Sequence, residues 1–394
     1  MKFPGTSRTC TYIIILKNSI LLTQKRQDEP ESYPIGHDTV VPEWDGSMKD
    51  IPADRIAWLF AGIGDARHFF GTMPKKNYHF TLIDLKPSSL ARNLLLFQLL
   101  SDLGPFRLGG DGDETMAGII YVYGLQIMPS YAYDMLQKTL DKLIDKVSKG
   151  EAIARWIYVP DSQRSALNHH LRAWQRHLDG KYDAPSFRKW GIQQDHMERM
   201  SRLSTQGRTH DQIPPFCDSD QVMYETFGIM IPNASLLRKH EPTLDRLIKN
   251  LKPNSLQAEQ RVRDYLDKNW KPNVTIIDVD WDIRRETDES SDPYIFSNPS
   301  KLGWKLNSGP DEYDARLAGL TSTSAYFEGF FNMVSGALKQ LEERLTVEVV
   351  IGEMSDCFER IHLDAFTLRD EMQGNADPQS FPKKYDRIHM SNIP

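Results

Sequence analysis

The sequence has few cysteines and little excess charge of either sign. Only three cysteines occur in 394 residues, Cys10, Cys217 and Cys357, and no two of them form a CxxC pair. This spacing excludes a disulfide framework and a cysteine-rich zinc module. The formal net charge is −6 and the isoelectric point is about 6.0. We therefore expect a reduced, cytoplasmic globular protein with no nucleic acid and no anionic membrane as a partner.

Long hydrophobic runs are also missing. The most apolar N-terminal stretch, residues 10–22, is interrupted by Lys17 and Asn18. Neither half approaches the roughly 20 residues that span a bilayer. Lys17 also stands where a signal peptide has its apolar centre. We expect neither a membrane anchor nor secretion, and interpret this stretch as a short strand or a surface-docked segment.

Several motifs with known chemistry are absent as well. The sequence contains no HExxH, no GxSxG, no P-loop and no protein-kinase motif set. His169 and His170 adjoin on a predicted helix, but neighbouring helical residues point apart, so we favour packing over metal ligation. We favour packing also for His68, which follows a glycine-rich turn. The sequence therefore predicts no metal site.

The most regular pattern begins after residue 54. Residues 56–61 form a short apolar run that ends in Gly62-Ile63-Gly64, and residues 78–83 form a second run that ends in Asp84. An apolar helix begins near Pro87, a residue that suits the first helical position because its missing N–H needs no partner there. Continuous apolar strands joined by helices are typical of a parallel sheet buried on both faces.

Two further runs, 347–351 and 385–390, predict two more strands of the same α/β sheet. We expect four segments: an irregular lead-in over 1–54, the first half of a core over 55–103, a mainly helical insertion or lid over 104–345, and the second part of the core over 346–394. Within the insertion, residues 274–279 are predicted to form a strand, and an aromatic helix face over 326–345 is expected to pack internally. Either the insertion completes the sheet, or the chain is a truncated form.

The glycine turn and Asp84 together indicate nucleotide binding. Glycine tolerates positive φ and allows close approach of a ligand to the backbone. An acid at the end of the next strand can accept both hydroxyls of a ribose. A dinucleotide fingerprint would have a third glycine where this chain has Arg67, which weakens that interpretation. The structural alternative is that the glycines only close a tight turn and that Asp84 caps the next helix.

Polar residues also follow the two later strands. Glu353, next to Met354, could receive an adenine amino group, although an exposed loop acid is an equal alternative. Ser391 and Asn392 follow the fourth strand, where a polar side chain would face a reacting centre; a strand-end turn is the alternative.

Several segments together resemble a known family. They are residues 33–39 (YPIGHDT), 59–68 (LFAGIGDARH), 80–84 (FTLID), 91–96 (ARNLLL) and 385–394 (YDRIHMSNIP). They resemble the fungal domain of unknown function 4470, which often accompanies MYND zinc fingers and is related to the N-terminal region of dynein axonemal assembly factor 3. The insertion resembles the family only loosely.

The resemblance implies a Rossmann-like, class I methyltransferase-type core with a mostly parallel sheet, split by the helical insertion. It implies S-adenosylmethionine as cofactor and methyl transfer to an unidentified small-molecule or protein acceptor. Gly62 and Gly64 would approach the amino-acid part of the cofactor, and Asp84 the ribose. The full set of implied cofactor-binding residues is Gly62, Gly64, Asp65, Asp84, Leu85, Glu353 and Met354. Ser391 and Asn392 are the implied catalytic residues.

Two departures from active methyltransferases argue against catalysis, whereas the intact set of Gly62, Gly64 and Asp84 favours it. Phe60 stands where many of them carry an acid that holds the methionine amino group, and Ala66 replaces a third glycine. The alternative is a non-catalytic scaffold or assembly factor that keeps the fold without the chemistry. Fold alone does not decide between the two.

Overall fold

The computed structural model describes residues 55–72, 77–103, 111–175, 182–204, 218–252, 255–280, 298–307, 322–372 and 377–390. Five strands form one sheet in the order β4-β6-β2-β1-β7, and every pairing in it is parallel. They are β1 (Arg55–Ala61), β2 (Asn77–Asp84), β4 (Ile157–Tyr158), β6 (Leu345–Ile351) and β7 (Arg387–Met390). The four predicted strands therefore lie in one parallel sheet, with β2 beside β1, and the expected α/β class is confirmed.

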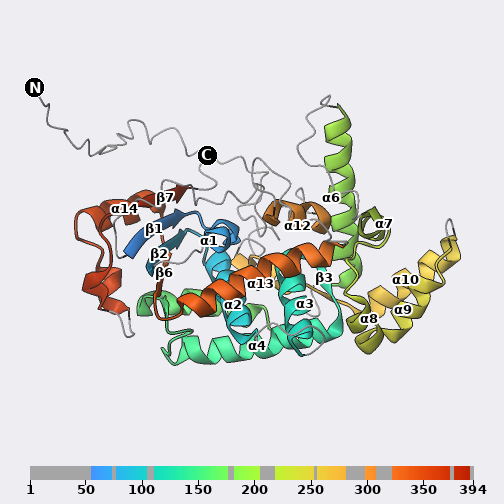
Figure 1. The fold of residues 1–394 in the computed structure, drawn as a ribbon, viewed down its shortest axis with the longest axis horizontal. Helices are drawn as coiled ribbons and strands as arrows, with labels where there is room; N and C mark the ends of the chain where they lie inside the picture. Colours follow the sequence, from blue (N-terminus) through green and yellow to red (C-terminus); the bar gives the residue numbers. More distant parts are fainter. Residues whose placement is uncertain are drawn as a thin grey trace, which may run out of the picture.

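The chain between β2 and β6 is mainly helical, as expected (Figure 1). It also adds β4 to one edge of the sheet. A separate antiparallel pair joins β3 (Ile127–Met128) and β5 (Lys271–Pro272). The helices are α1 (Arg67–Gly71), α2 (Pro87–Asp102), α3 (Asp111–Gly124), α4 (Ser130–Ser148), α5 (Arg164–Ala173), α6 (Ala184–Ser204), α7 (Asp218–Phe227), α8 (Ala234–His240), α9 (Pro242–Lys249), α10 (Leu256–Asn269), α12 (Pro299–Asn307), α13 (Thr323–Leu341) and α14 (Met354–His362). Short 3-10 helices are η2 (Asp161–Gln163), η5 (Val274–Ile276), η7 (Thr367–Glu371) and η8 (Pro378–Ser380).

The predicted strand over 274–279 is wrong, because the chain turns there into η5. Asn273 is fully buried, and its Oδ1 accepts hydrogen bonds from the backbone N–H and the hydroxyl of Thr275. Its Nδ2 donates to backbone carbonyls at the end of α3, including that of Leu125. A side chain that bonds to its own backbone competes with extended pairing, and here it fixes a turn instead.

The two faces of the sheet are covered very differently. One face packs on α1 and α2, and behind α2 the helices α3, α4, α5 and α13 continue the same large core. The other face carries a smaller core made with α14 and η7 (Figure 1). α2 is buried on nearly all sides because it lies between the sheet and the helical insertion.

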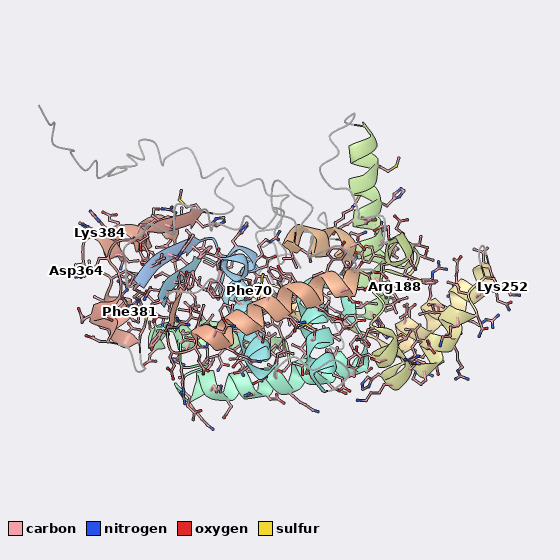
Figure 2. The ribbon with its side chains drawn as sticks, viewed as in Figure 1. Phe70, Arg188, Lys252, Asp364, Phe381 and Lys384 are labelled. Atoms are coloured by element: carbon pink, nitrogen blue, oxygen red, sulfur yellow. The ribbon has the colours of Figure 1, made fainter. Side chains whose placement is uncertain are left out.

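The aromatic face of α13 joins the insertion to the sheet layer. Phe330 and Phe331 are fully buried and make edge-on ring contacts with Phe70 of α1, which lies near the centre of the molecule in Figure 2. Phe331 also contacts the ring of Tyr123 at the end of α3, with ring centroids 5.1 Å apart. These rings are core, as expected from the sequence.

A cluster of charged side chains lies on the face of the sheet that carries the smaller core. Glu348 of β6 and His79 of β2 are both fully buried, and His79 Nε2 lies 2.5 Å from Glu348 Oε1. Arg369 of η7 donates three hydrogen bonds to the same carboxylate, and Nη2 of Arg55 lies 2.5 Å from Nδ1 of His79. Tyr385 accepts from Arg369. The cluster therefore connects β1, β2 and β6 with the segment that follows α14.

Candidate functional site

The turn after β1 has the backbone conformation that its glycines predict. Gly62 and Gly64 have φ values of 71° and 53°, and Ala66 has a φ of 59°. The N–H groups of Gly62 and Ile63 both donate to the carbonyl of Ile83 on β2, at 2.9 and 3.2 Å. A Cβ added to Gly64 would meet no heavy atom within 4 Å. The turn thus bends back across β2, and Gly64 faces open space.

The side chain of Asp84 connects the glycine turn with the start of α2. Its Oδ2 accepts from the N–H of Gly64 at 3.0 Å, and its Oδ1 accepts from the N–H of Lys86 at 2.9 Å. Burial raises the pKa of Asp84, and the hydrogen bonds from Lys86 and Gly64 oppose that rise. Each carboxylate oxygen has two lone pairs, so both oxygens keep acceptor capacity for a ligand.

The end of β6 lies directly beside Asp84. The N–H of Gly352 donates to the backbone carbonyl of Asp84 at 3.0 Å. Leu85 is 61% exposed, an unusual value for a leucine at the end of a central strand. Met354 packs partly on the smaller core. The structure therefore brings the predicted residues of β1, β2 and β6 together along one edge of the sheet.

Glu353 is exposed and is the N-cap of α14. Its carboxylate accepts from the N–H of Asp356 at 2.8 Å and from the hydroxyl of Ser355 at 2.6 Å. Burial acts to raise the pKa of Glu353, but these hydrogen bonds outweigh it and lower the pKa. Part of its acceptor capacity is therefore committed to the helix. Ser391 and Asn392, the implied catalytic residues, lie outside the described residues.

Asp65 is held inside the protein. Its side chain is almost fully buried and forms an ion pair with Arg67, with 2.8 Å between Arg67 Nη2 and Asp65 Oδ2. Tyr123 at the end of α3 donates to the same oxygen at 3.1 Å. Burial raises the pKa of Tyr123 strongly, so its hydroxyl stays a donor. Asp65 thus ties the glycine turn to the insertion.

Two histidines lie together at the ends of β1 and β7. The rings of His68 and His389 are tilted by 32° with their centroids 4.2 Å apart, and the centroid of the Phe60 ring lies 5.6 Å from that of His389. His68 is buried, as expected. Sequence reasoning missed His389, because its place depends on β7 pairing with β1 so that His389 lies opposite Phe60.

Asn93 is a second missed residue. It is almost fully buried on α2, and its Nδ2 donates to the carbonyl of Gly64 at 2.9 Å. Its Oδ1 is buried and has no hydrogen-bond partner among the described residues. The only available signal was its position in the segment 91–96 that resembles the family.

Residues 34–124 match the family model of a domain of unknown function, DUF4470. The expected resemblance is therefore confirmed over that segment. The DUF4470 match includes the glycine turn, Asp84 and Asn93, and it ends with α3, before β6 and β7. No curated protein and no solved structure matches the chain. Within the described residues, no helix is both long and apolar enough to cross a membrane.

Proposed function

We propose that the carboxyl edge of the sheet binds S-adenosylmethionine and that the protein transfers its methyl group to a small-molecule or protein acceptor. The observation that carries the proposal is the bond between Gly64 N–H and Asp84 Oδ2, which joins the ends of two central parallel strands. In open α/β sheets, ligands bind outside the carboxyl ends of the strands where the strand order reverses. Here that reversal lies between β1 and β7. A Rossmann-like, class I methyltransferase-type core is the fold that we propose for this sheet.

The residues at this edge fit the adenosine half of the cofactor. The remaining lone pairs of Asp84 suit ribose hydroxyls, and the exposed side chain of Leu85 offers an apolar surface to a base. Glu353 and Met354 follow the neighbouring strand, where an acceptor for the adenine amino group is expected.

The methionine half of the cofactor would meet different side chains here from those in many active methyltransferases. Phe60 is fully buried against Phe69, so position 60 offers no carboxylate to a ligand ammonium. Asn93 donates from Nδ2 to the carbonyl of Gly64, and its Oδ1 has no partner among the described residues, so we assign this acceptor to the ligand ammonium. The cofactor supplies an electrophilic methyl group, and the protein's task is to hold the donor and acceptor in line.

A second function is supported by the internal bonds of the same residues. Asp84, Asp65 and Glu353 each accept hydrogen bonds from the protein itself. The glycines close a tight turn, as in the structural alternative, although the N-cap of α2 is Lys86 and not Asp84. In a scaffold or assembly factor, these residues would stabilise the fold and would bind no ligand.

The methyltransferase should bind the cofactor beside Leu85, whereas the scaffold should not. A substitution at Leu85 therefore distinguishes the two functions. Asp84 is a poor first variant, because its removal also breaks two bonds of the fold. Leu85→Glu places a charge on the expected adenine surface and leaves the core untouched. Leu363→Glu is the matched control, because Leu363 is equally exposed, at 64%, and follows the far end of α14.

The measurement is a thermal shift with S-adenosylhomocysteine. Ligand at a hundred times its dissociation constant should stabilise the wild type and Leu363→Glu by about 2.7 kcal/mol, and Leu85→Glu by much less. No shift of the wild type at millimolar ligand would reject the cofactor and leave the scaffold function. A shift that persists in Leu85→Glu would place the ligand elsewhere.

A further inference from the structure

A cluster of one histidine and two aspartates lies in the insertion, away from the strand ends. His170 of α5, Asp278 and Asp280 each offer one ligand atom, and these three atoms lie within 4.8 Å of one another. His170 Nε2 is 3.3 Å from Asp280 Oδ2. In a tetrahedral zinc site with bonds near 2.1 Å, neighbouring ligand atoms are about 3.4 Å apart. The pair of His170 and Asp280 has this spacing, and Asp278 offers an oxygen atom within 4.8 Å of both.

The elements that carry this cluster are rigidly joined. The indole N–H of Trp174, at the end of α5, donates to the carbonyl of Ile277 at 2.8 Å, and both residues are fully buried. The N–H of Asp280 donates to Asp278 Oδ1 at 3.1 Å, which fixes the turn between the two aspartates. The bond from Trp174 therefore holds α5 against the segment that carries the two aspartates.

His170 itself supplies the second observation. Its side chain is 1% exposed, and its Nδ1 has no hydrogen-bond partner among the described residues. A neutral imidazole is the form that binds metal ions. Nε2 faces Asp280, and the described residues supply no partner for Nδ1.

His169 orients one of the carboxylates. Its Nε2 lies 3.1 Å from Asp280 Oδ1, which leaves Oδ2 of the same group directed toward His170. Metal-binding carboxylates are commonly held by such outer hydrogen bonds. His169 therefore contacts one oxygen of the Asp280 carboxylate, and His170 contacts the other.

We propose that His170, Asp278 and Asp280 bind a divalent first-row transition metal ion, with Zn²⁺ as the reference ion and water completing its coordination. A nitrogen ligand combined with carboxylates favours Zn²⁺ or a similar ion over Mg²⁺ and Ca²⁺, which take oxygen ligands. The ion would join α5 to the segment after η5. Neither the glycine turn nor Asp84 takes part, so this site is independent of the proposed cofactor.

The test uses the full chain without a histidine tag, freed of metal with a chelator and titrated with Zn²⁺. We expect one ion per chain by elemental analysis. Asp280→Asn is the first variant, because Asp280 is half exposed and its removal leaves the core intact. Loss of an outer partner alone costs 10- to 100-fold in affinity, so loss of a ligand should weaken Zn²⁺ binding by about a hundredfold or more.

Glu114→Gln is the matched control. Glu114 pairs with His240 at 2.8 Å, and the described part of the chain adds no third ligand to that pair. This variant should bind Zn²⁺ as the wild type does. Co²⁺ should give visible absorption bands in the wild type that Zn²⁺ removes and that Asp280→Asn lacks. No saturable Zn²⁺ binding, or equal affinity in the wild type and Asp280→Asn, would overturn the proposal.

Discussion

The buried histidine of β2 shows how a single side chain can be assigned a protonation state from its neighbours. Arg55 can only donate, so Nδ1 of His79 accepts from it, and the ring hydrogen must lie on Nε2, facing Glu348. Burial lowers the pKa of His79, Glu348 opposes this, and Arg55 and Arg369 lower it further. The native ring is therefore neutral.

This assignment predicts a loss of stability in acid. Below pH 6.5 the unfolded chain binds a proton at His79 that the folded protein does not, so the free energy of unfolding falls as the pH falls. The slope from one such group reaches about 1.4 kcal/mol per pH unit between the unfolded and folded pKa values. Urea unfolding at pH 7.5 and 5.0 should show a smaller loss for His79→Gln than for the wild type. Equal losses in both proteins would contradict the assignment.

Glu353 is the N-cap of α14, and we expect its side chain to stabilise the first turn of that helix. An N-cap side chain is worth about 1 kcal/mol, so Glu353→Ala should lower the free energy of unfolding by that amount. Glu359→Ala, at an exposed position later in the same helix, should change it by less than about 0.5 kcal/mol. Chemical denaturation of both variants checks this. If the two variants are equally stable, the cap contributes nothing.

Elements with a continuous apolar pattern were predictable, and elements defined by a distant partner were not. β1, β2 and β6 each show their burial in the local sequence. β4 has only two residues, and it is a strand only because it pairs with β6. The turn at Asn273 likewise depends on a distant partner, because the Asn273 side chain bonds to backbone carbonyls at the end of α3.

The candidate site follows the same division. Gly62, Gly64 and Asp84 could be placed at one edge from a strand-turn-helix pattern alone. The ion pair of Asp65 with Arg67 and the bond from Tyr123 could not be foreseen, because they depend on how the insertion packs. The cluster of His170 with Asp278 joins residues 108 positions apart that no local pattern connects.

The whole molecule shares one large core across the sheet layer and the insertion, so we expect the two to unfold together. Phe331→Ala would open a cavity between α13, α1 and α3, and should lower the free energy of unfolding by about 3 to 5 kcal/mol. Met333→Ala, at a half-exposed position on the same helix, should be nearly neutral. Far-UV circular dichroism and tryptophan fluorescence should give coincident transitions. Two separate transitions would show that the insertion is an independent unit.

The position of β7 beside β1 has a consequence for how the protein is made on the ribosome. Asp386, just before β7, accepts a hydrogen bond from the N–H of Ala57, which is 329 positions earlier in the chain. At about 5 to 20 residues per second, translation needs roughly 15 to 65 s to supply that partner. During this interval the newly made β1 and β2 have apolar side chains and unpaired edges, which are prone to aggregation. We therefore expect that chains stopped before β7 aggregate more readily than the full chain, because one edge of β1 then has no partner strand.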